Sequence, residues 1–200
     1  MRFRFPDDPI RVPPHVILSM EQSEPGRHVA QPKYDGWRRP MYLENGVWKF
    51  FSKYLTGQQA KETPPADLVA ELESLGFPDG TAFDAEWMGR RCTSVLRGKH
   101  YFVLFDLLYL GGQWQGDVPM IQRYGNLKTL LALHKAKAKT DSSRIELVPM
   151  VDSGLVKFYE QQRFNPLTEG IVVKAVDSGL KGGLSRATDN PKWLKVKYRD

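Results

Sequence analysis

The stretch from Gln31 to Arg38, QPKYDGWR, combines a lysine, an acid and an arginine around one glycine, a set that could form a reactive site. Lys33 lies three residues before Gly36, just ahead of a run that is typical of a strand. A lysine beside such a turn can project its amine from a sheet edge into open space, where it can act as a nucleophile. Asp35 would add a hydrogen-bond acceptor and Arg38 a bidentate donor. The alternative interpretation is a surface turn with a solvated lysine, which describes most strings of this kind.

Three later segments place lysines and carboxylates on strand-like sequence. In Phe83–Glu86 two carboxylates flank one alanine, so both point to the same face of a pleated strand. Glu169–Lys174 begins with a carboxylate and ends with a lysine, and Trp193–Lys197 places two lysines on one face. A face that gathers these charges is costly to bury empty, and a phosphate with a divalent cation would fill it. The three segments therefore predict a site for a phosphate and a metal ion.

The elements that must position these residues follow from periodicity and turn signals. Residues 1–30 are rich in proline, and we interpret them as an irregular lead-in with one short strand. The chain shows no repeat and no interdomain linker, so residues 1–200 are predicted to form one α+β domain built on antiparallel strands. In the first half of the chain, the expected elements are a strand near Val16–Met20, a hairpin of Trp37–Leu43 and Val47–Lys53 around an Asn-Gly turn, a helix capped by Thr63 and ended by Gly76, and strands Thr81–Met88 and Tyr101–Leu110. A helix is expected from Asp117, with Met120, Tyr124, Leu127, Leu131 and His134 on one face. The last expected elements are a strand Ile145–Met150, a helix Gly154–Arg163, and strands Glu169–Val176 and Trp193–Tyr198.

The composition is that of a mildly basic globular chain. The formal net charge of +6 permits a polyanionic partner, although many basic proteins have none. No apolar run approaches the ~20 residues of a membrane span, and the first residues lack the apolar stretch of a secretory signal. Cys92 is the only cysteine, which excludes an intrachain disulfide and a thiolate metal cluster. We expect a monomer in a reducing cytoplasm, with no membrane partner.

Taken in order, the charged segments resemble the nucleotidyltransferase motifs of covalent polynucleotide ligases and messenger-RNA capping enzymes. Lys33–Arg38 is similar to the Lys-x-Asp-Gly-x-Arg motif, in which the lysine is the nucleophile. Phe102–Gly112, FVLFDLLYLGG, is similar to the segment whose aromatic residue stacks on adenine, and it is most similar to that of bacterial and phage DNA ligases. The remaining matches are Phe83–Glu86 to the Asp-Gly-Glu motif, Glu169–Lys174 to the Glu-Gly-hydrophobic-hydrophobic-x-Lys motif, and Trp193–Lys197 to the closing Lys-x-Lys motif. The resemblance covers about residues 31–197.

The resemblance implies the adenylation domain of an ATP-dependent DNA ligase, in the cytoplasm of a bacterium or a phage-infected cell. Its substrates would be ATP, with Mg²⁺ or Mn²⁺, and nicked duplex DNA. Lys33 would carry AMP as a phosphoramidate, and later steps would seal a 5′-phosphate to a 3′-hydroxyl. The implied nucleotide-binding residues are Gln31, Pro32, Asp35, Arg38, Glu86, Phe105, Val172, Lys195 and Lys197. Glu86 and Glu169 would bind the metal. Arg38, Ser52, Lys53, Lys181 and Arg186 would contact the nucleic acid.

Several positions depart from the family pattern. Ala85 replaces a glycine, and Ser52–Lys53 stands where many ligases have Ser-Arg followed by a glycine turn. Gln31 stands where a glutamate often reads the adenine amino group, which leaves GTP open as a substrate. The chain ends three residues after Lys197, so we expect no C-terminal oligonucleotide-binding (OB) fold, which could be a separate partner. A naturally minimal enzyme and a truncated catalytic domain both remain open.

Two other functions share these residues. An RNA ligase or an RNA-capping guanylyltransferase would use the same lysine chemistry. Arg38 argues against most RNA ligases, which carry serine or threonine at that position. The other alternative is a catalytically silent module that binds nucleic acid with a decayed site. The charged residues of all the motifs are present together, which argues against decay.

Overall fold

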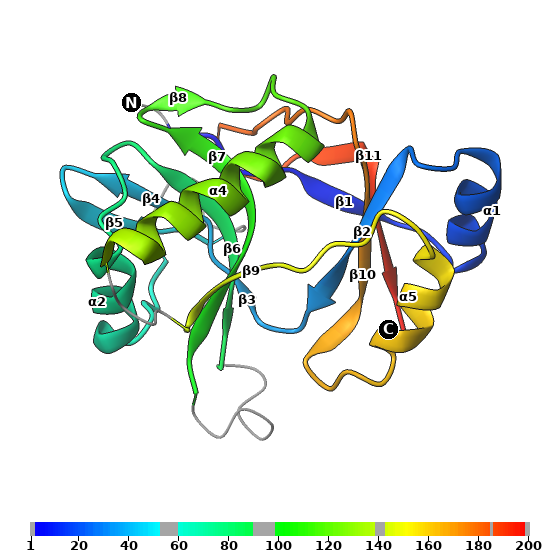
Figure 1. Ribbon diagram of the computed structural model, residues 1–200, viewed down its shortest axis with the longest axis horizontal. Coiled ribbons are helices and arrows are strands. Elements are labelled where there is room, and N and C mark those ends of the chain that lie inside the picture. Colours follow the sequence, from blue (N-terminus) through cyan, green and yellow to red (C-terminus); the bar gives the residue numbers. More distant parts are fainter. Residues whose placement is uncertain (1–2, 53–59, 90–98, 139–142, 185, 199–200) are drawn as a thin grey trace.

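The computed structural model of the protein describes residues 3–52, 60–89, 99–138, 143–184 and 186–198. It has an α+β fold with two sheets that lie next to each other (Figure 1). Most strand pairs are antiparallel. The smaller sheet has the order β1 (Asp8–Arg11), β11 (Asp189–Lys197), β10 (Thr168–Ala175) and β2 (His28–Tyr34). The larger sheet has the order β5 (Val47–Phe50), β4 (Met41–Glu44), β6 (Ala82–Met88), β7 (Tyr101–Leu110) and β8 (Gln113–Trp114), with β3 (Trp37–Arg38) beside β6 and β9 (Ile145–Leu147) beside β7.

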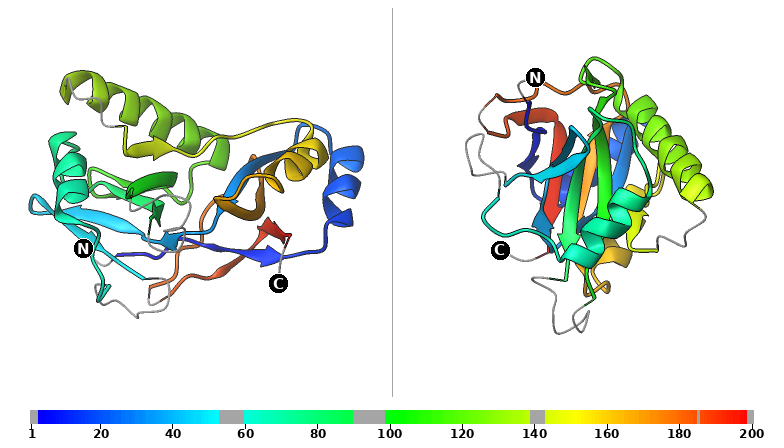
Figure 2. Two further views of the ribbon diagram at one scale, coloured as in Figure 1. Left: turned by 90° about the horizontal axis from the view of Figure 1, so that it is seen from below. Right: turned by 90° about the vertical axis from the view of Figure 1, so that its left-hand side faces the viewer.

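Helices cover the outer sides of both sheets. The described residues form the helices α1 (His15–Ser23), α2 (Ala66–Ser74), α4 (Met120–Ala138) and α5 (Leu155–Gln162). Figure 2 shows α4 along the outside of the larger sheet, while α1 and α5 lie together at the other end of the molecule. None of the helices in the described part of the chain is long and apolar enough to span a membrane.

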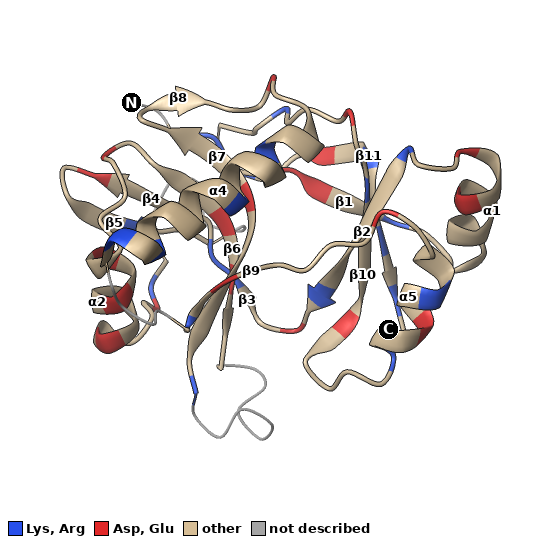
Figure 3. Ribbon diagram, viewed as in Figure 1, with Lys and Arg blue, Asp and Glu red and all other residues tan. Residues whose placement is uncertain are grey.

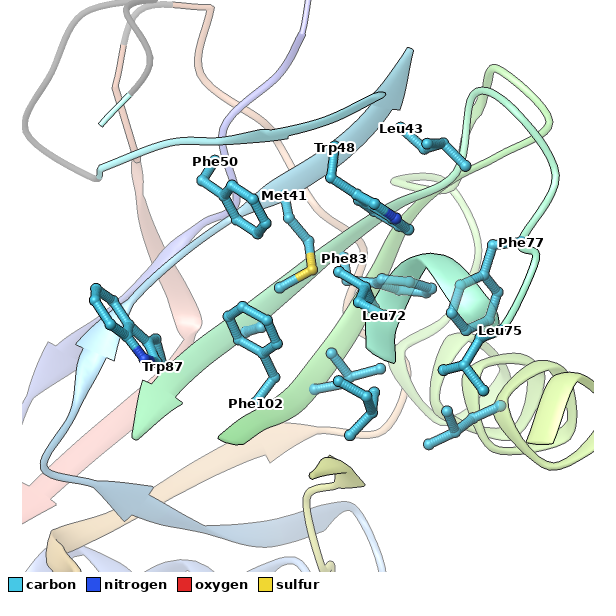
Figure 4. Packing of buried hydrophobic residues seen from close by; sticks show 14 of the residues in the cluster. Met41, Leu43, Trp48, Phe50, Leu72, Leu75, Phe77, Phe83, Trp87 and Phe102 are labelled. Carbon is cyan, nitrogen blue, oxygen red and sulfur yellow. The ribbon is translucent and has the colours of Figure 1, made fainter. Parts of the chain in front are cut away.

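The core of the larger sheet is built from aromatic and aliphatic side chains of β4 to β7, α2 and α4 (Figure 4). Phe83 lies fully buried at its centre, stacked on Trp48 at 5.9 Å and edge-on to Phe77 at 5.0 Å between ring centroids. Replacing such a residue with alanine costs about 3–5 kcal/mol in known cores. β7 reads as an almost continuous apolar run because it is a central strand with both faces covered.

The turn of the predicted hairpin is confirmed, whereas the strand predicted at Trp37–Leu43 is divided into β3, which pairs with β6, and β4. β4 and β5 pair as antiparallel neighbours, with Glu44 opposite Val47. The two residues between them, Asn45 and Gly46, have φ angles of 53° and 74°. Both angles are positive, as a two-residue type I′ turn requires, and Asn-Gly is the preferred pair for it.

The prediction for residues 1–30 was wrong for most of these residues. The predicted strand at Val16–Met20 is part of the helix α1, while β1 and the start of β2 occupy segments predicted to be irregular. The apolar run around Ile17 suggests a strand locally. In the fold, however, Ile17 and Met20 lie three residues apart on one helix face and pack against α5 and the smaller sheet. Tertiary packing therefore decides this segment.

The later elements follow the predictions with small shifts. α2 begins at Ala66, after an N-cap at Pro65, so Thr63 does not cap it. In α4 the buried face includes Arg123, whereas the predicted Tyr124 is only partly buried. Arg123 forms a buried ion pair with Asp106 of β7 at 2.9 Å, which ties this helix to the central strand.

Candidate active site

A cavity of about 790 Å³ is lined by strands of both sheets and contains most of the predicted site residues. Figure 3 shows that basic and acidic segments of both sheets occur where the sheets face each other. The lining includes eight basic and five acidic residues, so the cavity suits an anionic ligand. The charged residues are Arg11, Lys33, Arg38, Arg39, Lys61, Lys174, Lys195 and Lys197, and Asp8, Glu62, Asp84, Glu86 and Glu169.

Lys33 lies on β2, directly opposite Gly170 of β10. Its Nζ donates a hydrogen bond to Glu169, and Lys197 Nζ donates to the other oxygen of that carboxylate at 2.8 Å. Burial alone would raise the pKa of Glu169, but the hydrogen bonds from the two lysines outweigh it and lower the pKa. A Cβ at Gly170 would lie 1.9 Å from the Val196 carbonyl oxygen. A glycine is therefore needed for β10 to carry Glu169 this close to the two lysines.

The turn after Lys33 depends on a second glycine. A Cβ at Gly36 would come within 2.7 Å of Glu86 and Met88, so only glycine allows the turn to pack on β6. The Gly36 amide donates a hydrogen bond to Glu86 at 3.0 Å. Glu86 is only 8% exposed, and burial raises its pKa to about 7 against the opposing attraction of Lys33 and Arg38.

Arg38 connects the two sheets through a network of acceptors. Its guanidinium binds Asp84 of β6 in a bidentate manner, at 2.9 and 2.7 Å. It also donates to the Asp8 carboxylate at 2.8 Å and to the Asp7 carbonyl at 2.6 Å. Burial would lower the pKa of Arg38, but the attraction of Asp84, Asp8 and Glu86 outweighs it and raises the pKa. Arg38 is therefore a fixed cation in the cavity wall.

One part of the cavity has an apolar lining suited to a planar group. Val172 lies opposite Gln31 across the β10–β2 pair, and Phe105 of β7 also lines the cavity. Phe105 stacks on Tyr34 at 6.5 Å between centroids. Gln31 is 2% exposed, and its Nε2 has no hydrogen-bond partner among the described residues. A buried donor without a partner is costly, and a ligand acceptor would satisfy it.

Lys174, the lysine that ends the Glu169–Lys174 motif, is a buried cation. It lines the cavity with its Nζ 4.2 Å from the centroid of the Trp193 ring. Burial lowers its pKa to about 8, although the attraction of Asp106 and Asp84 opposes this change. Its contact with an aromatic face is favourable when the cation is desolvated.

Most of the predicted site residues are brought together by the fold. Eleven of them line the cavity: Gln31, Pro32, Lys33, Arg38, Ser52, Glu86, Phe105, Glu169, Val172, Lys195 and Lys197. Three others, Asp35, Lys181 and Arg186, do not line it. The Asp35 amide donates to Leu167, and the Lys181 amide donates to the Asp7 carboxylate. Lys53 lies outside the described residues.

Two groups of lining residues were missed by the sequence analysis. Asp8 and Arg11 belong to β1, whose four residues are too few to show a pattern. Arg39 is 5% exposed and lies over the rings of Trp37 and Trp87, at 5.0 and 5.7 Å from their centroids. The spacing of Trp37 and Arg39, two residues apart, was the signal for this contact in the sequence.

The carboxylates of the cavity fit a hard divalent cation bound together with a phosphate. Within the described ranges, no group of three or more His, Cys, Asp or Glu side chains could hold a metal ion by itself. Mg²⁺ commonly uses only one or two protein carboxylates and takes its other ligands from phosphate and water. Glu86 and Glu169, which both line the cavity, match this requirement.

Comparison with known proteins finds distant relatives at the level of sequence. No protein-family model matches the chain. A probable DNA ligase of Dictyoglomus thermophilum is 23% identical over 190 residues, which cover 86% of this chain and 31% of that protein. A DNA ligase of Methanoculleus marisnigri is 23% identical over 204 residues, covering 90% and 33%. The chain thus spans about a third of the length of these curated relatives.

Solved structures of DNA ligases contain a domain with a fold similar to that of this chain. The ligase domain of M. tuberculosis LigD matches with a TM-score of 0.60 and 19% identity, over 86% of this chain and 53% of that one. The ATP-dependent DNA ligase of bacteriophage T7, in complex with ATP, matches with a TM-score of 0.60 and 16% identity, over 98% and 69%. The chain therefore has the fold of the adenylation domain of ATP-dependent DNA ligases and is a distant relative of these enzymes.

Proposed function

We propose that the chain carries out the nucleotidyl transfer of an ATP-dependent DNA ligase, with Lys33 as the nucleophile. The observation that carries this proposal is the position of Lys33 Nζ. It lies in a cavity with an excess of basic residues, beside Lys197 and bound to Glu169, and Phe105, Val172 and Gln31 line the same cavity. An amine, phosphate-binding cations and an apolar recess for a base are the parts that this chemistry needs.

In the first step, Lys33 Nζ attacks the α-phosphorus of ATP. A P–N bond forms, the P–O bond to the β-phosphate breaks, and pyrophosphate leaves. The amine must first release a proton to solvent, because an ammonium has no lone pair with which to attack. Lys195 and Lys197 would hold the α-phosphate as compact point charges. A bound Mg²⁺, held by Glu86, Glu169 and phosphate oxygens, would supply further charge neutralisation.

The later steps concern the polynucleotide. AMP passes from Lys33 to the 5′-phosphate of a nick, and the 3′-hydroxyl then attacks that activated phosphate and releases AMP. Both curated relatives are named as DNA ligases, one of them as a probable one, which supports DNA as the substrate. Arg38 and Ser52 line the cavity and are candidates for contacts to the nucleic acid. These residues can contact few phosphates, so binding should be weak and should depend only modestly on salt.

The test is covalent labelling. The protein is incubated with α-labelled ATP and Mg²⁺ and separated by denaturing electrophoresis, and we expect acid-labile label on the wild type. Lys33→Ala and Lys33→Arg should carry no label, because neither side chain is nucleophilic. Lys157→Ala, which removes an exposed lysine of α5, is the matched control and should label normally. Label on Lys33→Ala would refute the nucleophile assignment.

Three further measurements separate the alternatives. Preferential labelling by GTP would favour a guanylyltransferase. GTP is tested because Gln31 stands where a glutamate often reads the adenine amino group. Joining of single-stranded RNA without sealing of nicked DNA would favour an RNA ligase. Binding of nicked DNA by an unlabelled wild type would favour a silent binding module.

A further inference from the structure

Asp8 is an acidic residue of the cavity that belongs to none of the sequence motifs. It lies on β1, which pairs in parallel with β11 and forms an edge of the smaller sheet. Its amide is fixed by a hydrogen bond to the Thr188 carbonyl at 2.8 Å. The carboxylate, 22% exposed, lines the cavity. β1 therefore delivers a negative charge into a cavity whose predicted ligand is also negative.

The two oxygens of Asp8 face two different cations. Oδ1 accepts a hydrogen bond from Arg38 at 2.8 Å, and Oδ2 lies 4.0 Å from Lys195 Nζ. These cations come from different sheets, Arg38 from β3 and Lys195 from β11. Both are residues that would serve a phosphate in the proposed function. The Asp8 carboxylate thus lies between two cations. Under the proposed function, a phosphate group would bind at the same position.

The hydrogen bonds of Arg38 show why this matters. A guanidinium has five N–H groups, and Arg38 uses four of them, two toward Asp84, one toward the Asp7 carbonyl and one toward Asp8. Asp84 is buried and holds its pair in bidentate geometry, so it is the costlier partner to replace. Asp8 is partly exposed and accepts a single hydrogen bond from Arg38. An incoming phosphate would displace Asp8 first.

We propose that Asp8 is a positioning residue that holds Arg38 and Lys195 while the cavity is without an anion and yields them to a phosphate. This inference rests on the proposed function for the identity of the ligand. Exchange of one partly exposed carboxylate for another anion has a small net cost, because each state contains a comparable ion pair. A terminal phosphate carries up to two charges, so it competes successfully with a single carboxylate. Asp8 therefore lowers the affinity of the cavity for anions in general.

The experiment compares phosphate binding by the wild type, Asp8→Asn and Asp8→Glu. Asp177→Asn is the matched control, because it removes the same charge from an exposed position outside the cavity. Binding is measured in EDTA, without covalent reaction, for ATP, for inorganic tripolyphosphate, and for nicked duplex DNA with either a 5′-phosphate or a 5′-hydroxyl. These arms separate a nucleotide phosphate from a polynucleotide phosphate.

We expect Asp8→Asn to bind at least one phosphate ligand about fivefold more tightly than the wild type, with a steeper dependence on NaCl. The gain should be absent for the 5′-hydroxyl nick if the 5′-phosphate is the displacing group. Asp8→Glu, which keeps the carboxylate, and Asp177→Asn should resemble the wild type. A gain in affinity is informative because damage to the fold would produce a loss.

The inference is overturned if Asp8→Asn binds all three phosphate ligands as the wild type does, or more weakly, or if no variant binds any of them. Covalent labelling of the same preparations distinguishes this failure from failure of the proposed function. A labelled wild type with no gain in Asp8→Asn refutes the role of Asp8 alone. An unlabelled wild type with tighter tripolyphosphate binding by Asp8→Asn refutes the ligase chemistry and leaves the role of Asp8 standing.

Discussion

Glu86 should make the stability of the protein depend on pH in a defined window. Its pKa rises from 4.5 to about 7 on folding, mainly because of burial. Below pH 4.5 the carboxyl is protonated in both states. Between pH 4.5 and 7 the unfolded chain ionises while the folded protein keeps the proton, so the free energy of unfolding falls. Above pH 7 the loss is complete, and a difference of this size corresponds to about 3 kcal/mol.

The substitution Glu86→Gln tests this value, because glutamine resembles the protonated acid and cannot ionise. Near pH 4.5 the two proteins should be equally stable, and near pH 8 Glu86→Gln should be more stable by about 3 kcal/mol. Urea unfolding at half-unit steps from pH 4.5 to 8.5 measures the difference. Glu160→Gln, at an exposed position of α5, should show a flat difference. A difference for Glu86→Gln that does not change with pH would refute the reasoning.

Three further substitutions test the packing and chemistry of the site. Gly170→Ala would place a Cβ 1.9 Å from the Val196 carbonyl oxygen, so we expect a loss of more than about 3 kcal/mol in urea unfolding. Arg38→Gln removes the cation that pairs with the buried Asp84 and should cost about 3–5 kcal/mol in the same assay. Gln31→Glu adds an acceptor for the adenine amino group and should raise the ratio of labelling by ATP to labelling by GTP about fivefold in a competition assay, whereas an unchanged ratio would contradict base reading by this residue.

The fold could be predicted from sequence wherever a local pattern determines the structure. The Asn45–Gly46 turn requires positive φ angles that few residues adopt, so the hairpin is readable from two letters. The central strand β7 is recognisable because burial on both faces demands a continuous apolar run. α1 was predicted as a strand because the short apolar run around Ile17 fits both the helical period and the strand period. Its helical state depends on packing against α5, which is far away in the sequence.

The same contrast applies to the site: residues in local motifs could be predicted, and residues placed by long-range pairing could not. Lys33, Glu86 and Glu169 were predicted because each lies in a motif whose spacing can be recognised in the sequence. Asp8 was missed because β1 is four residues long and becomes a strand only by pairing with β11 at the other end of the chain. The bond between Arg38 and Asp8 likewise joins residues of two sheets, which no local pattern encodes.

The carboxylates of the cavity have a role that the motifs alone do not indicate. The predicted nucleophile and three predicted nucleotide-binding cations lie beside carboxylates in the structure, Lys33 and Lys197 beside Glu169, and Arg38 and Lys195 beside Asp8. Unpaired charges in a partly buried cavity are costly, so a site prepared for an anion must neutralise itself while the anion is absent. Glu169 was predicted as a metal ligand, and its pairing with two lysines makes it their counter-ion as well. Under the proposed function, ligand binding would then be an exchange of partners, in which a phosphate would take over the cations and a divalent cation would take over the released carboxylate.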